Sequence, residues 1–307
     1  MIIVTLLWST AGVVTRQLDT SSSFEVTFWR SFFNALTLIV VLAILRGPSL
    51  LRTLLSSPVV VWMSGVCWAV MFTAFMVAIT MTTVANVLVT MAIGPLLTAL
   101  MTRIYLHHQL PGRTWIAIFT AGAGILWMYG TQAGDGISFA GSIVALAVPL
   151  AAAINFTMLQ HVGHQGSANS PGTKVAQPHD MLLAVLIGAV FSSVLCLPLA
   201  WPLLTSTHDL QLLALLGATQ LALPCLLMVR LTRVLAAAEI SLLGLLEVIF
   251  GVTWAWLGAG ELPNTNTLLG GALVLGALLG NEVYALRRGT AAEFKHGVPP
   301  APTGGTE

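Results

Sequence analysis

The chain is a succession of long apolar runs separated by short polar breaks. Most runs lack charge over the roughly 20 residues that an α-helix needs to cross a bilayer. They are continuously apolar, whereas the strands of a membrane barrel alternate apolar and polar residues over about ten positions. We therefore expect an all-α integral membrane protein. The predicted transmembrane helices are ten, at about residues 1–18, 24–45, 58–80, 83–105, 113–131, 137–159, 180–201, 209–230, 236–258 and 265–286.

Composition supports this class. Hydrophobic residues make up 57% of the chain and charged residues only 7%, against roughly 25% charged residues in soluble domains. The net charge is +1 without a basic patch, which argues against nucleic acid as a partner. The three cysteines lie inside apolar runs, so we interpret them as small buried side chains rather than disulfides or metal ligands.

The distribution of Lys and Arg predicts the orientation, because cytoplasmic loops of membrane proteins are enriched in these residues. An even number of helices then leaves both termini in the cytoplasm of a multi-pass protein of the bacterial inner membrane. Residues 289–307 are expected to form a disordered cytoplasmic tail. With the N-terminus inside, the basic residues of the inner loops are Arg46, Arg52, Arg103, Arg113, Lys174 and Arg233, whereas the outer side has little beyond Arg16.

The two halves of the chain resemble each other. Residues 82–130 and 234–286 each begin with small residues, continue through an apolar span to a Leu-Pro turn, and then open a Gly-rich span. Five helices per half require opposite orientations in the membrane, which is the inverted repeat of secondary transporters. We predict repeats at 1–135 and 136–288. The alternative is that any two helices rich in Leu, Ala and Gly look alike.

Four sets of short motifs occur in a specific order. They are Leu6-Leu7-Trp8-Ser9 followed by Arg16, Phe28-Trp29-Arg30, Ile93-Gly94-Pro95, and Leu245-Leu246-Glu247 followed by Gly260-Glu261-Leu262. In order and spacing the chain up to Arg288 resembles the EamA family of the drug/metabolite transporter superfamily. It departs from the family pattern at Val248, where proline is usual, and at His108 or Gln109, where glutamate is usual.

The resemblance implies ten helices around a central cavity, with the third, fourth, eighth and ninth helices prominent in its wall. Bacterial members of the family are commonly exporters of amino acids and related metabolites. Exporters of aromatic and other amino acids are the nearest functional analogy.

Polar residues at membrane depth are the candidates for chemistry, because a charge at a helix centre costs about 2.5–3.5 kcal/mol on insertion scales. Glu247 lies near the middle of its predicted span. It could sense a substrate ammonium or carry a proton, or it could be neutral and bonded to a neighbouring helix. For Arg30 the structural interpretation is favoured, in which it snorkels outward or pairs with Glu25 or Asp19.

The predicted binding residues are aromatic and polar positions expected to face the cavity. The aromatic side chains could equally serve ordinary packing, and the amides could link helices. The predicted substrate-binding set is Trp8, Trp68, Phe72, Asn86, Asn155, Gln220 and Glu247. The predicted gating or helix-bending set is Pro95, Pro224 and Glu239, although Glu239 could simply stabilise a helix terminus.

No enzyme signature is present, since the sequence has neither a Walker loop nor an HExxH motif. We expect no catalytic residue, cofactor or metal, and no obligatory protein partner. The predicted function is a secondary transporter that exports amino acids or similar small metabolites by alternating access, with proton coupling left open. The alternatives are a nucleotide-sugar or drug carrier of the same superfamily, a membrane enzyme or a lipid flippase.

Overall fold

The computed structural model describes residues 1–19, 22–105, 110–132, 136–169, 178–231 and 243–296. Within these ranges every regular element is helical, which confirms the all-α class. The elements are α1 (Ile2–Thr15), α2 (Ser23–Arg46), η1 (Gly47–Ser49), α3 (Leu50–Leu55), α4 (Val59–Met81), α5 (Val84–Ala92), α6 (Gly94–Tyr105), α7 (Gly112–Gln132), α8 (Gly136–Asn169), α9 (Pro178–Ala200), α10 (Thr207–Leu215), η2 (Leu216–Ala222), α11 (Leu223–Leu231), α13 (Leu246–Ala259) and α14 (Thr265–His296).

Seven helical segments of the described chain are long and apolar enough to cross a membrane. Two further apolar helices, α1 and α13, are shorter, and α7 coincides with the predicted span at 113–131. The predicted ninth span begins at 236, outside the described residues, and α13 begins only at Leu246. The structure therefore confirms a multi-pass helical membrane protein, and the count of ten spans stays a prediction.

The last helix is longer than the sequence analysis expected. It continues to His296, whereas the tail was expected to begin at residue 289. The added segment contains Ala, Glu and Lys, which have high helix propensity. The remainder of the predicted tail, 297–307, lies outside the described residues.

Side-chain caps mark several helix starts. Ser22, Thr83 and Ser206 each accept a hydrogen bond from a backbone N–H in the first turn of the helix that follows, which satisfies one of the free donors there. At the C-terminal end of a helix, Gly260 terminates α13 with φ +67°, a left-handed conformation that favours glycine. These polar positions coincide with breaks between the predicted spans.

Proline accompanies two irregular helices. The predicted fourth span is divided into α5 and α6 at Ile93, just before Pro95. In the predicted eighth span, the π-helix η2 ends just before Pro224. Proline has no N–H and cannot donate to the carbonyl four residues earlier, which here belongs to Gln220. The wider π-turn thus places Gln220 in a segment that is not regular α-helix.

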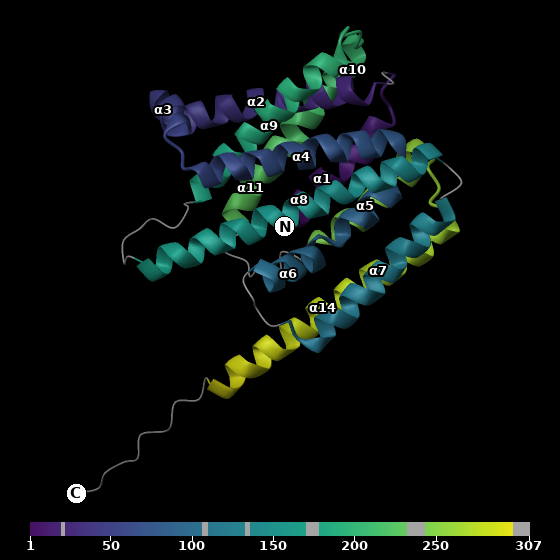
Figure 1. Ribbon diagram of the computed structural model, residues 1–307. Coiled ribbons are helices and arrows are strands. Elements are labelled where there is room, and N and C mark those ends of the chain that lie inside the picture. The colour runs from purple at the N-terminus through teal and green to yellow at the C-terminus, as the bar shows by residue number, and fades with distance from the viewer. Residues whose placement is uncertain (20–21, 106–109, 133–135, 170–177, 232–242, 297–307) are drawn as a thin grey trace, which may run out of the picture.

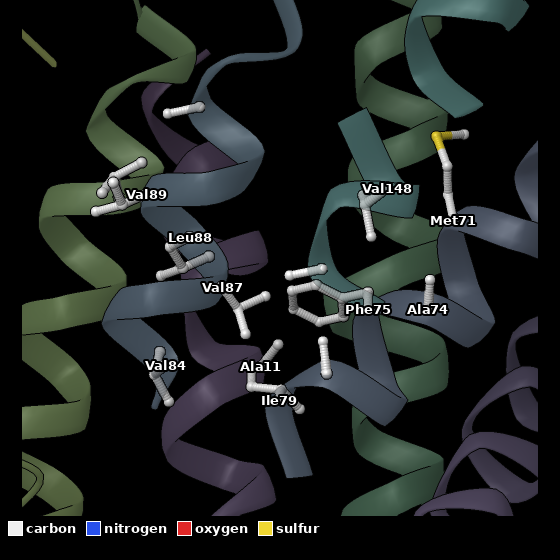
Figure 2. Packing of buried hydrophobic residues seen from close by; sticks show 14 of the residues in the cluster. Ala11, Met71, Ala74, Phe75, Ile79, Val84, Val87, Leu88, Val89 and Val148 are labelled. Atoms are coloured by element: carbon white, nitrogen blue, oxygen red, sulfur yellow. The ribbon is translucent and has the colours of Figure 1, made fainter. Parts of the chain in front are cut away.

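The helices form one bundle with a distinct pair at its edge (Figure 1). Helix α2 packs against α9, and α4 packs against both α8 and α9. Helix α1 contacts α13, while α7 and α14 lie side by side at the edge of the bundle. Figure 2 shows the core between α1, α4, α5 and α8, where Phe75 and Ile79 of α4 point toward Val87 and Ala11.

The α7–α14 pair approaches closely at two glycines. A Cβ added to Gly124 would lie 2.7 Å from the carbonyl oxygen of Gly270, and one added to Gly270 would lie 2.6 Å from the carbonyl oxygen of Gly124. Small residues permit such backbone contact between membrane helices. Packing thus explains Gly124 and Gly270 of these Gly-rich spans, whereas a Cβ added to Gly122 or Gly276 would have no described atom within 4 Å.

Successive helices alternate in direction, so the bundle has two chemically different ends. We call the end that carries Met1, Arg46 and Arg103 the basic end. The opposite end, which carries Asp19, Glu25, Asp209 and Glu261, is the acidic end; there Asp19 N donates to Asp209 Oδ1 at 3.1 Å. This division agrees with the loop asymmetry seen in the sequence.

Candidate solute-binding cavity

A cavity of about 580 Å³ lies inside the bundle. Its wall is formed by α1, α2, α4, α5, α6, α8, η2, α11 and the start of α13. Pockets of about 300–1,000 Å³ that are mainly apolar with a few polar groups are typical of small-molecule sites. This cavity therefore has the size and composition expected for a small organic solute.

Aromatic side chains form one part of the wall. Trp68, Phe72 and Phe75 lie on one face of α4, with the rings of Trp68 and Phe72 5.4 Å apart between centroids. Trp8 of α1 and Phe156 of α8 also line the cavity. The spacing of the three α4 residues in the sequence, four and then three, already placed them on one helical face.

Arg30 of α2 is a charged member of the wall. Its side chain is only 2% exposed. The guanidinium donates to Gln220 Oε1 through Nε at 3.3 Å and Nη2 at 2.8 Å. Its Nη1 has no hydrogen-bond partner among the described residues, and Cζ lies 5.4 Å from the centroid of the Phe75 ring.

The expectation that Arg30 snorkels outward or pairs with Glu25 or Asp19 is wrong. Glu25 instead accepts hydrogen bonds from the backbone N–H groups of Leu204 and Thr205, both at 2.7 Å, and from the Thr205 hydroxyl. These donors come from the segment that leads into α10. The acid therefore satisfies a helix connection at the acidic end and is not available to Arg30.

Gln220 connects three parts of the wall. Its Oε1 accepts from Arg30, and its Nε2 donates to the carbonyl oxygen of Trp8 at 3.1 Å. Gly217 lets η2 come close to α2, because a Cβ there would lie 2.7 Å from the Arg30 carbonyl oxygen. The π-helix and this glycine thus bring the amide to the guanidinium.

Glu247 lies in the first turn of α13 and lines the cavity. Of the side chains that the structure describes, none donates a hydrogen bond to it or forms an ion pair with it. An acid in the first turn of a helix is favoured by the helix dipole. The carboxyl group therefore remains able to interact with a solute.

The remaining predicted positions differ in whether they line the cavity. Asn86 is buried away from the wall, where its Nδ2 donates to Thr82 Oγ1 at 3.0 Å and its Oδ1 accepts from Thr267 Oγ1 at 2.7 Å. This contact links α5 to α14, as the interhelical alternative expected. Asn155 is also fully buried outside the wall, and neither of its amide atoms has a partner among the residues that the structure describes. Pro95 lines the cavity and Pro224 does not; Glu239 lies outside the described residues.

A polar contact closes the acidic end, and the sequence analysis did not predict it. Arg16 Nε donates to Glu261 Oε2 at 2.7 Å, and Arg16 Nη2 donates to the Thr82 carbonyl oxygen at 2.6 Å. Glu261 Oε1 accepts from the Val84 backbone N–H at 2.6 Å. We call these four residues the Arg16–Glu261 clasp. It joins the end of α1 to the α4–α5 and α13–α14 turns.

The cavity extends toward the basic end of the bundle. Met1, Thr98 and Met228, from the half of the bundle toward the basic end, are among its lining residues. No residue of the clasp is part of the wall. Between the two lies the core of Figure 2, which includes Ala11 and Ile79, each 1% exposed. The bundle is thus closed on the acidic side of the cavity.

One group of metal-ligand types occurs at the acidic end. Potential ligand atoms of Asp19, His208 and Asp209 lie within 4.8 Å of one another. Asp209 is buried and already accepts from the Asp19 backbone N–H, while its own N–H donates to Ser206 Oγ at 3.1 Å. These contacts explain the group as a helix start, and it lies outside the cavity wall.

Comparison with known proteins gives one family match and one similar fold. Residues 1–130 match the EamA-like transporter family. The whole fold is similar to a solved structure described only as the crystal structure of a protein, with a TM-score of 0.61 and 17% identity over 93% of this chain and 96% of that one. No curated protein matches. Residues 1–130, which carry Trp8, Arg30, Trp68 and Phe72 of the cavity, are therefore similar to the EamA-like transporter family of the drug/metabolite transporter superfamily.

Proposed function

We propose that the protein is a secondary transporter that exports amino acids, aromatic and other neutral ones, or similar small metabolites across the bacterial inner membrane. The observation that carries the proposal is the cavity, where the aromatic wall of α4 and Trp8 accompanies Glu247. An ammonium group is attracted both by a carboxylate and by aromatic faces. A small amine with an apolar side chain complements this surface.

The packing of the helices supports the predicted inverted repeat. If the two halves are equivalent, each contact between two spans should recur between the counterparts of those spans in the other half. The contact of α4 with α8 then corresponds to that of α11 with α1, and the contact of α1 with α13 to that of α8 with α5 and α6. The contact of α4 with α9 corresponds to that of η2 with α2. Inverted repeats place the substrate site at the interface between halves, and the wall of this cavity takes residues from both predicted halves.

Alternating access is supported by the asymmetry of the two ends. The positive-inside rule assigns the basic end to the cytoplasm, and the cavity extends toward that end. In this arrangement a cytoplasmic solute enters while the Arg16–Glu261 clasp holds the outer side closed. Export then requires that the clasp opens and the basic end closes. Glu247 is also the candidate carrier if a proton moves in the cycle.

The other functions receive less support. Nucleotide sugars carry phosphates that call for several cations, and Arg30 is the one Lys or Arg that the described wall contains. A drug carrier remains the second candidate, because the wall is largely aromatic and aliphatic. A membrane enzyme or flippase has no specific observation in its favour.

Counterflow in proteoliposomes tests the proposal. Vesicles loaded with unlabelled phenylalanine should accumulate labelled phenylalanine transiently, and other neutral amino acids inside should support the same exchange. Nucleotide sugars and quaternary ammonium drugs should not. Exchange of one of these compounds without exchange of any amino acid would contradict the proposal.

A further inference from the structure

We propose that Arg30 and Gln220 form an anion subsite of the cavity, in which the guanidinium binds the carboxylate of the solute and Gln220 positions the guanidinium. The inference rests on the transport function proposed above. It assigns to Arg30 a role in substrate selection, whereas the sequence favoured a structural one.

The environment of Arg30 first shows an unusual charge balance. A charged side chain within a membrane helix is costly and is ordinarily paired with an opposite charge. No carboxylate in the described part of the chain lies within 4.0 Å of the guanidinium. Glu247 shares the cavity wall but does not make this contact. Among the residues that the structure describes, the one side-chain acceptor bonded to Arg30 is the neutral amide of Gln220.

The donor geometry leaves one edge of the guanidinium unused. Arginine has five N–H donors, and Gln220 Oε1 receives those of the Nε–Nη2 edge. Nη1 has no partner in the described part of the chain, and Arg30 as a residue is 2% exposed. The Nη1–Nη2 edge therefore keeps unused N–H donors, and such an edge matches the two oxygens of a carboxylate. Phe75 covers a face of the group without using these donors.

Gln220 fixes the position of this edge. Its Nε2 donates to the Trp8 carbonyl oxygen, which directs Oε1 toward Arg30. Because Trp8 is itself in the wall, the same chain of bonds connects the anion subsite to the aromatic surface. Gln220 is thus a positioning residue that acts through Arg30.

The two charged positions together specify the solute class. Arg30 and Glu247 share the cavity wall and are complementary to a carboxylate and an ammonium, the two charged groups of an amino acid, whose side chain would then lie against the aromatic wall. An amine that lacks the carboxylate keeps the contact with Glu247 and loses the one with Arg30. We expect such an amine to bind at least about tenfold more weakly, because a hydrogen bond to a charged group contributes that much or more.

Binding to the purified full-length chain tests the inference without transport. Thermal unfolding in detergent should show stabilisation by phenylalanine at concentrations at which phenethylamine, its decarboxylated analogue, has little effect. Competition against labelled phenylalanine gives the ratio of affinities. Equal affinity for both compounds would overturn the anion subsite while leaving an amine transporter intact. Absence of binding by every amino acid, together with absence of counterflow, would remove the proposed function and the inference with it.

Two variants locate the effect. Gln220→Glu puts a carboxylate of nearly the same shape beside Arg30. It should neutralise the guanidinium charge that attracts the solute carboxylate and so weaken phenylalanine binding at least about tenfold. Its melting temperature without solute should change little, because the new ion pair offsets the lost hydrogen bond to the Trp8 carbonyl oxygen. Arg30→Lys keeps the charge and loses the planar fork, and should weaken phenylalanine much more than phenethylamine. Wild-type selectivity in a folded Gln220→Glu protein would overturn the inference.

Discussion

Two arginines in this protein lie in contrasting regions. Arg16 belongs to the clasp at the acidic end, is 27% exposed and has the Glu261 carboxylate at 2.7 Å. Arg30 lies in the cavity wall, is 2% exposed and has a neutral amide as its partner. Arg16, which pairs with a carboxylate of the same protein, links the end of α1 to the turns that it contacts. A charge at membrane depth without such an acid is costly to keep, and this cost is understandable if a solute supplies the acid.

The largest effect that would separate the two regions is expected at Glu247. Glu247→Gln keeps the shape of the side chain but removes the carboxylate, so amino acid counterflow should fall at least about tenfold while folded yield is unchanged. Glu282→Gln, which alters an acid of α14 outside the wall, is the matched control. Unchanged rates in Glu247→Gln would mean that Glu247 only supports the helix.

A second comparison distinguishes loss of stability from loss of transport. Gly124→Val forces a side chain against the Gly270 carbonyl oxygen, at a cost of roughly 1–3 kcal/mol for overpacking. Gly122→Val is the control, because a Cβ there meets nothing within 4 Å. The melting temperature in detergent should fall only for the first. Counterflow per folded molecule should be the same for both, since α7 and α14 do not line the cavity.

The clasp should show a smaller coupling. Because Arg16 and Glu261 are partly exposed, a double-mutant cycle with alanine should give an interaction energy of roughly 0.2–1 kcal/mol. The single variants should favour the state that is open at the acidic end. Additive effects of the two substitutions on both stability and solute release would show that the pair does not act as a unit.

The smallest effect is expected at the α5–α14 hydrogen bond. Thr267→Val removes the donor to Asn86 Oδ1 with little change in shape, and such bonds between membrane helices average about 0.6 kcal/mol. Phenylalanine affinity should not change. A large loss of affinity would return Asn86 to the solute site and weaken the contrast between this amide and Gln220.

Local patterns were sufficient for the all-helical class and for the shared face of the aromatic residues on α4. Apolar runs specify membrane helices because the requirement is one of length and composition, and the spacing of Trp68, Phe72 and Phe75 specifies a shared face. The partners of the charged groups could not be predicted from local patterns. Arg30 meets a residue 190 positions away and Arg16 one 245 positions away. Which acceptor lies opposite depends on helix packing that no local pattern encodes.

The two amides illustrate the same limit. Asn86 and Gln220 looked equivalent in the sequence, yet only Gln220 lies in the cavity wall. The difference comes from the π-helix before Pro224 and from the close approach at Gly217, which together determine the direction of the Gln220 side chain. The family resemblance singled out the positions of Arg16, Arg30, Glu247 and Glu261, but not their partners.

The central claim is that the closed core between the cavity and the clasp opens during transport. Ala11 lies in that core (Figure 2), and Ala11→Cys, in a chain with Cys67, Cys196 and Cys225 replaced by alanine, reports its exposure. A membrane-impermeant thiol reagent on the acidic side should label this cysteine when phenylalanine is exchanging, and hardly at all without solute or in Glu247→Gln. Counterflow that proceeds while Ala11→Cys stays unlabelled would contradict the account.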